Sequence, residues 1–262
     1  MRELGELVDV EDPAWPVLLE QVSASLTAVE VLPVDASQAG PCLVQLQVTV
    51  RSCLGALAFH TGGLRVDGGW LRVFGGSHSG GAAGLPGLSQ VNRFPEVLEP
   101  EWRPVGGLVL AHDVLGGVFA LNGADTAASG RPGQPGEVVY FAPDRLEWEA
   151  LGVGHGAWVA WLLSGQLDQF YEGLRWPGWQ EEVAALSGSE GTSVVPFLWT
   201  AEAQRDLAAT SRRAVPMTEL LGLSSHFCRQ LGLPVPGFRG EPSTPTSRAT
   251  NGCAVLPVGE AR

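Results

Sequence analysis

Lysine is absent from this chain of 262 residues, since all 16 of its basic residues are arginine. This absence excludes every mechanism that depends on a lysine amine. Among these are the P-loop lysine, the Schiff-base lysine, the lysine that anchors pyridoxal phosphate and the usual kinase lysine. The exclusion holds whatever genomic bias produced the composition.

Paired cysteines and long apolar runs are also lacking. No two cysteines form a C-x-x-C pair, so neither a zinc knuckle nor a redox pair is indicated, and we expect reduced thiols. No uninterrupted apolar run reaches about 18 residues, and the N-terminal MRELGELVDVED has neither a basic region nor an apolar core. We therefore expect a soluble, cytoplasmic protein that needs no metal or cofactor. The cysteines are Cys42, Cys53, Cys228 and Cys253.

Positive charge is scarce, since 28 acidic residues give a formal net charge of -12 and a pI near 4.8. Nucleic-acid binding draws its affinity from clustered cationic side chains, so a nucleic-acid partner is excluded, and a membrane partner is not expected. A basic protein is the partner that this charge favours. The alternative is that the acidic charge only keeps the protein soluble.

Apolar periodicity predicts the elements of the first half of the chain. Asp12 followed by Pro13 is a helix-start signal, and apolar residues then recur at helical spacing as far as Leu26. The alternation in CLVQLQVTV is typical of a half-buried strand. Two Gly-Gly turns, TGG and DGG, divide the next apolar stretch into an antiparallel meander. The predicted strands are 29–34, 42–50 and three segments within 54–74.

The second half of the chain continues this pattern after a long loop. Residues 75–105 are rich in Gly, Ser and Pro, which indicates either a functional loop or a disordered one. Four strands follow, then short helices and a last helix with Ser224 and Ser225 facing outward. Residues 234–262 have the composition of a disordered tail, which leaves one domain over 1–233. The strands are predicted at 108–111, 118–121, 138–141 and 146–151, around an excursion at 122–136, and the helices within 153–174, 180–186 and 217–231.

The predicted fold class is therefore α+β, with a mainly antiparallel twisted sheet and helices packed on one face. A 262-residue chain with 45% hydrophobic residues can bury a sizeable core of this kind.

Two groups of residues are candidates for a catalytic or a metal-binding site. Ser79 in HSGG follows a strand, as the nucleophile of a serine hydrolase does, but Ser77 stands where that motif needs glycine. The following GAAGLPG is also a poor helix. His112 and Asp113 are adjacent, yet no other histidine lies at ligand spacing, so Asp113 is expected to close a turn through its own side chain.

Other polar and aromatic residues are candidates for binding. Glu147 and Glu149 share one face of a predicted strand, either as an exposed acidic edge or as a recognition surface for a basic partner. Trp176 and Trp179 flank a Pro-Gly turn, either covering the core or forming an interface hot spot. The predicted binding residues are Asp113, Asn122, Glu147, Glu149, Trp176 and Trp179, and no catalytic residue is assigned.

Several long motifs occur in order along residues 1–233: RSCLGALAFHTGGLRVDGGWLRVFGG, AHDVLGGVFALNG, GEVVYFAPDRLEWEALG and LRWPGWQEEVAALSG. The chain resembles in these motifs an uncharacterised bacterial family known as domain-of-unknown-function family DUF2625, which implies no activity or cofactor. More distantly, residues 105–175 resemble the Smi1/Knr4-like (SUKH) immunity superfamily. That likeness implies an α+β binding protein of a kind that often neutralises toxins.

The sequence thus favours a non-enzymatic protein-binding module, immunity-like or regulatory. One alternative is a small serine hydrolase that uses the loop at 75–84. Another is a structural or small-ligand domain. An apolar cavity on the sheet would indicate the small-ligand domain, whereas a continuous exposed surface would indicate protein binding.

Overall fold

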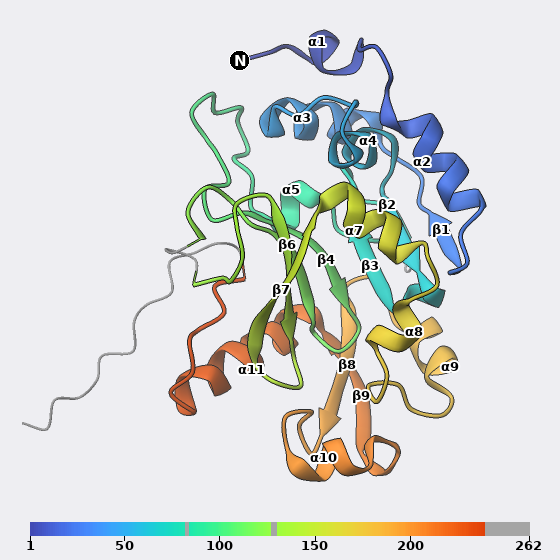
Figure 1. Ribbon diagram of the computed structural model, residues 1–262, viewed down its shortest axis with the longest axis vertical. Coiled ribbons are helices and arrows are strands. Elements are labelled where there is room, and N and C mark those ends of the chain that lie inside the picture. The colour runs from blue at the N-terminus through green and yellow to red at the C-terminus, as the bar shows by residue number, and fades with distance from the viewer. Residues whose placement is uncertain (82–83, 127–129, 239–262) are drawn as a thin grey trace, which may run out of the picture.

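The computed structural model describes residues 1–81, 84–126 and 130–238, and its centre is a seven-stranded antiparallel sheet (Figure 1). Each strand pairs with the next strand in the sequence, so the spatial order equals the chain order. The α+β class and the four strands predicted after residue 105 are confirmed. The strands are β1 (Val29–Val31), β2 (Gly63–Val66), β3 (Leu71–Phe74), β4 (Leu108–Asp113), β5 (Val118–Leu121), β6 (Glu137–Ala142) and β7 (Glu147–Gly154).

The main core lies on one face of this sheet. Strand side chains such as Leu64, Phe119 and Tyr140 pack there with Trp158 and Leu162, and all five are buried. Helices from both halves of the chain cover this face and the sheet's end (Figure 1). They are α1 (Leu4–Val8), α2 (Ala14–Ser23), α3 (Ala36–Leu46), α4 (Cys53–His60), α7 (His155–Leu162), α8 (Leu167–Phe170) and α9 (Trp179–Ala184).

A second, smaller core lies on the opposite face. Phe74, Val109 and Phe141 point to this side and pack with residues of α5 (Leu88–Val91) and α11 (Met217–Gln230). Helices therefore contact both faces of the sheet, which adds a second helical layer to the single layer that the sequence predicted.

A two-stranded antiparallel sheet stands beside the large one and was not predicted. It pairs β8 (Glu190–Val195) with β9 (Ser211–Pro216), and α10 (Ala201–Arg205) lies in the connection between them. β9 leads directly into α11, so this small sheet fixes where the last helix begins (Figure 1).

The strand predicted at 42–50 is wrong, because most of that segment belongs to α3. Asp35 caps this helix, its carboxylate accepting a hydrogen bond from the backbone N–H of Ser37 at 2.9 Å. Ala39, Cys42 and Leu43 are buried at three- and four-residue spacing, so the helical period outweighs the local alternation.

The first of the three strands predicted within 54–74 is also wrong, whereas the other two are β2 and β3. Ser52 begins α4 instead, since its hydroxyl accepts a hydrogen bond from the N–H of Gly55 at 3.0 Å. In α11 the expected outward position of Ser224 and Ser225 is wrong as well, because Ser224 is buried and Ser225 is partly buried beside the sheet.

The loop predicted at 75–105 contains only the short helix α5, apart from residues 82–83, which lie outside the described residues. The predicted tail begins at residue 234, but residues 234–238 pack against the sheet, and Pro236 is buried. Residues 239–262 of that tail lie outside the described part of the chain. Among the described residues no helix has the length and apolarity needed to span a membrane.

Candidate functional site

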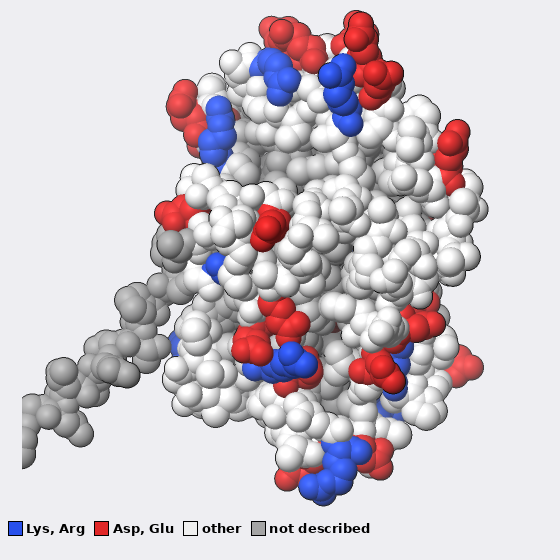
Figure 2. All heavy atoms as spheres, in the orientation of Figure 1, with Lys and Arg blue, Asp and Glu red and all other residues white. Residues whose placement is uncertain are grey.

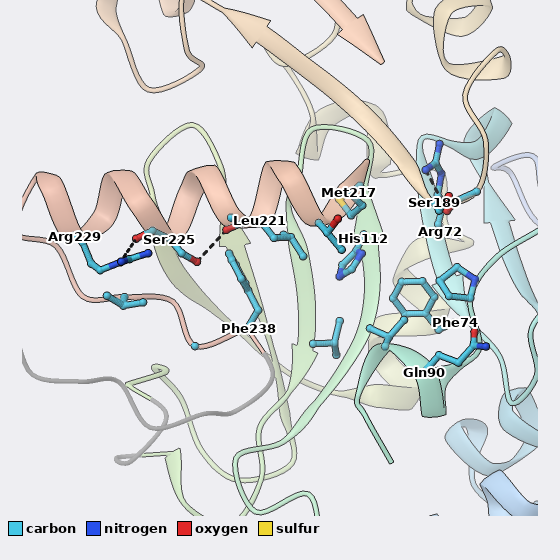
Figure 3. A pocket seen from close by; sticks show the side chains of 18 residues that line it. Arg72, Phe74, Gln90, His112, Ser189, Met217, Leu221, Ser225, Arg229 and Phe238 are labelled. Atoms are coloured by element: carbon cyan, nitrogen blue, oxygen red, sulfur yellow. Dashed lines mark hydrogen bonds between the residues drawn. The ribbon is translucent and has the colours of Figure 1, made fainter. Parts of the chain in front are cut away.

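A pocket of about 930 Å³ lies between α11 and the face of the sheet formed by β3 and β4 (Figure 3). Its walls come from six separate parts of the sequence: β3, the loop around α5, β4, the residues just before β8, α11, and the segment that follows α11. The lining residues are Arg72, Phe74, Pro86, Gln90, Val91, Val109, His112, Gly188, Ser189, Met217, Thr218, Leu221, Gly222, Ser225, Arg229, Val235, Gly237 and Phe238.

Strand and helix periodicity together make most of this lining apolar. Phe74 and Val109 stand on the face of the sheet that looks toward α11. On the helix, side chains at four-residue intervals lie on one face and point to the sheet. Figure 3 shows this row running along α11: Met217, Leu221, Ser225 and Arg229.

Arg72 stands at one end of the pocket and is almost completely buried, with 3% of its surface exposed. Its Nε donates to the carbonyl oxygen of Gly69 at 3.2 Å, and its Nη1 donates to the carbonyls of Gly188, at 3.4 Å, and of Glu190. Burial lowers the pKa of Arg72 to about 10, so the guanidinium stays charged at neutral pH. The two Nη1 contacts join β3 to the start of β8.

His112 is the partner of Arg72 across the β3–β4 ladder. Its ring lies edge-on to the ring of Phe74, with 4.9 Å between the ring centroids. The adjacent Asp113 points to the other face, as alternation in a strand requires. The pair His112-Asp113 therefore does not converge on one point, and within the described residues no group of three or more potential metal ligands occurs.

The segment 233–238 closes one side of the pocket after α11 ends. Trp148 donates from Nε1 to the carbonyl of Pro236 at 2.7 Å, and Arg131 donates from Nη2 to the carbonyls of Gly237 and Phe238 at 3.2 and 2.6 Å. The guanidinium of Arg131 also lies over the ring of Trp148, 4.6 Å from its centroid. Residues 234–238 of the predicted tail thus form one wall of the pocket.

Asp113, the first of the residues predicted to bind a partner, is fully buried at the β4–β5 turn. Its Oδ1 accepts hydrogen bonds from the N–H groups of Leu115 and Gly117 at 2.9 and 2.8 Å, which confirms that it closes a turn through its side chain. Its Oδ2 accepts from the hydroxyls of Tyr140 and Tyr171 at 2.8 and 3.2 Å. Burial raises the pKa of Asp113, and its position is structural.

Asn122 is also buried, and its Nδ2 donates to the carbonyl of Pro132 at 2.7 Å, across the excursion predicted at 122–136. Glu147 and Glu149 lie on β7, an edge strand of the sheet. Glu147 is exposed, and Glu149 forms an ion pair with Arg145 at 2.8 Å. The structure does not bring these three residues together.

Trp176 is buried, with 1% of its surface exposed, and Trp179 is partly buried. Both rings contact Trp70, with centroids 5.8 and 5.0 Å away. Arg175 lies over the rings of Trp70 and Trp179 and pairs with Asp67. Of the two interpretations of these tryptophans, the structure places them in the core. None of the six predicted binding residues lines the pocket, and a binding role for them stays a prediction.

Ser79, the residue on which the hydrolase alternative depends, is 2% exposed. Its Oγ accepts a hydrogen bond from the N–H of Leu85 at 2.8 Å, and Nδ1 of His78 contacts the carbonyl of the same residue at 3.0 Å. Both side chains thus hold the loop closed on itself. They do not form the nucleophile and base pair that this chemistry needs.

Sequence reasoning missed the pocket, although two signals for it are present. One is the arginine inside the apolar strand LRVF, a charged residue where a buried one is expected. The other is the four-residue repeat of Met217, Leu221, Ser225 and Arg229, an amphipathic stripe that ends in a cation.

Comparison with known proteins places the chain among bacterial relatives. The model of a family described as "Protein of unknown function DUF2625" matches residues 4–220. A relative from Escherichia coli strain K12, "Putative uncharacterized protein YbfG", is 40% identical over 220 residues, which cover 84% of this chain and 94% of the relative. An "Uncharacterized protein" of Haemophilus influenzae is 33% identical over 199 residues, 76% of this chain and 83% of that protein. No solved structure matches. The likeness to the Smi1/Knr4-like superfamily is not confirmed by these matches.

Proposed function

We propose that this chain, which belongs to the DUF2625 family, binds a small, largely apolar molecule in the pocket between the sheet and α11. The observation that carries this proposal is the pocket itself, with its volume of about 930 Å³. Sites for small molecules are typically concave, of about 300–1,000 Å³, mainly apolar and supplied with a few polar groups. An apolar cavity on the sheet is also the feature that distinguishes a small-ligand domain from a flat protein-binding platform.

Filling the pocket is expected to abolish this binding. Leu221 projects from the middle of the α11 row toward the sheet (Figure 3). In the variant Leu221→Trp the larger side chain occupies space that the ligand needs. The affinity for a neutral apolar probe should therefore fall at least about tenfold, which corresponds to a loss of about 1.4 kcal/mol of binding free energy. The probe is N-phenyl-1-naphthylamine, whose fluorescence rises in an apolar site, and the measurement is a titration of protein into probe.

The matched control is Leu231→Trp, at the exposed end of the same helix, where 57% of the leucine surface is accessible. This variant should bind the probe as the unchanged protein does. A chain that takes up no probe in a saturable way, or a Leu221→Trp variant with unchanged affinity, would refute the proposal.

A second candidate function is binding of a basic protein partner by β7, in an immunity-like or regulatory role in the cytoplasm. The formal charge of -12 and the position of Glu147 and Glu149 on an edge strand support it. Figure 2 shows acidic side chains on this face with basic ones beside several of them, so the recognition would be local.

The test is affinity capture with the full chain and with the double variant Glu147→Gln and Glu149→Gln. We expect the unchanged chain to retain a basic protein and the variant to retain at least about tenfold less of it. The reason is that the variant lacks the two carboxylates that would pair with the basic side chains of the partner. Equal retention by both chains would remove β7 from the proposal.

A further inference from the structure

We propose that the Arg72 end of the pocket binds the carboxylate of a long-chain aliphatic acid, whose chain lies along the apolar row of α11. This inference rests on the proposed function, since it names the chemical class of the ligand that occupies the same pocket. Its basis is the set of donors that Arg72 leaves unused.

A guanidinium carries five N–H donors. The contacts of Arg72 with the carbonyls of Gly69, Gly188 and Glu190 use those of Nε and Nη1. The two donors of Nη2 make no hydrogen bond to any residue within 1–81, 84–126 and 130–238. A side chain that is 3% exposed and lines the pocket thus has two donors available for an occupant.

Arg72 also forms no ion pair at contact distance with any acid among the described residues. The two acids whose charges act on Arg72 have their hydrogen bonds elsewhere: Asp113 with two tyrosines on the other face, and Glu190 with the N–H of Ser187 at 2.9 Å. Asp113 and Glu190 thus act on Arg72 through their charges without touching it, and an anion that enters the site would supply a counter-charge in direct contact.

The opposite end of the pocket also holds an arginine, but its setting differs. Arg229 is exposed, and its Nε donates to the carbonyl of Ser225 at 3.2 Å. Because an ion pair in contact with water contributes little, the anionic group gains most at Arg72. The ligand would therefore lie with its carboxylate at Arg72 on β3 and its aliphatic chain toward Leu221 and Phe238.

The number of charges favours a carboxylate over a phosphate. Arg72 offers one positive charge at this end, which a monoanion neutralises, whereas a dianion would leave one charge buried without a partner. The apolar part of the lining, including Val91, Val109 and Leu221, suits an aliphatic chain. An aliphatic acid satisfies both requirements.

Two probes with the same chain separate the head group from the tail. Dodecanoate and dodecanol are titrated into the full-length protein, each by displacement of N-phenyl-1-naphthylamine. We expect dodecanoate to bind about tenfold more tightly, because a charge-assisted hydrogen bond contributes about 1.5 kcal/mol or more. In the variant Arg72→Met the ratio of the two affinities should fall to about one. The control Arg213→Met, at an arginine whose side chain is 70% exposed on β9, should keep the ratio of the unchanged protein.

Each outcome bears on one proposal. If neither probe binds the unchanged chain, the proposed function fails. If both bind with equal affinity, the pocket binds apolar molecules and the carboxylate inference is wrong. If Arg72→Met does not fold, Arg72→Gln replaces it, since the glutamine amide can still donate to a carbonyl. The ratio of the dodecanoate and dodecanol affinities of the unchanged chain tests the inference without either variant.

Discussion

Replacing Asp113 by alanine is expected to lower the free energy of unfolding by about 4 kcal/mol, since each buried donor left without an acceptor costs about 1–3 kcal/mol. The carboxylate accepts four hydrogen bonds, two from backbone N–H groups at the β4–β5 turn and two from Tyr140 and Tyr171. Both tyrosines are buried, so water cannot replace the lost acceptor. The turn and its contact with Tyr171, the residue after α8, should loosen together.

The variant Asp113→Asn separates the hydrogen bonds from the charge. The amide oxygen can still accept from the two N–H groups, and the amide nitrogen can donate to the tyrosine hydroxyls. At pH 7 we expect a loss of only about 1 kcal/mol for this variant.

The pH dependence of that loss has a definite sign. Burial raises the pKa of Asp113 above its usual value of 3.8, so the folded chain holds this proton more tightly than the unfolded chain. The unchanged protein therefore loses stability as the pH rises from 3.8 through the raised pKa, and the asparagine variant lacks this contribution. The deficit of Asp113→Asn should be larger at pH 4 than at pH 7.

Urea unfolding of the three chains at pH 4 and pH 7, followed by circular dichroism, measures these differences. An alanine variant within 1 kcal/mol of the unchanged protein would contradict the structural role of Asp113. A deficit of the asparagine variant that grows with pH would contradict the raised pKa.

Removal of the Trp70 ring is the second large effect, with an expected loss of about 3–5 kcal/mol in Trp70→Ala. The ring is completely buried and contacts the rings of Tyr171, Trp176 and Trp179 at centroid distances of 5.4, 5.8 and 5.0 Å. Arg175 lies 4.9 Å from its centroid, so the variant also loses a cation–π contact. The cavity would lie where α8 and α9 meet the sheet.

The matched control is Trp102→Ala, because Trp102 is only partly buried and contacts the single ring of Phe94. This variant should lose about 1 kcal/mol. Guanidinium unfolding followed by circular dichroism compares the two. Equal losses would show that the cluster around Trp70 contributes no more than a surface aromatic residue does.

The strands after residue 105 could be predicted because their signal is local. Turns that contain Gly or Pro separate short runs of Val, Phe, Leu and Tyr, and the chain folds each run back on the one before. The segments 42–50 and 54–60 could not be predicted in this way. Their apolar residues suit either a strand or a helix, and the decision comes from the caps Asp35 and Ser52.

The candidate site was harder to predict than the fold, because it joins residues that are far apart in the sequence. Arg72 and Leu221 line one pocket, yet nothing in either local pattern indicates the other. The residues that the sequence did single out, such as Asp113 and Trp176, are conspicuous because they are buried and bonded. Unusual residues of this kind marked the core of the protein and not its open surface.

The order of the sheet bears on how the pocket comes into existence. Every strand pairs with its neighbour in the chain, but two of the junctions are long, at residues 32–62 and 75–107. Closing a long loop costs more chain entropy than closing a hairpin. We therefore expect the sheet to form from two blocks of neighbouring strands, one containing β2 and β3 and another containing β4 to β7. Since Arg72 belongs to the first block and His112 to the second, the polar end of the pocket arises only when the two blocks join.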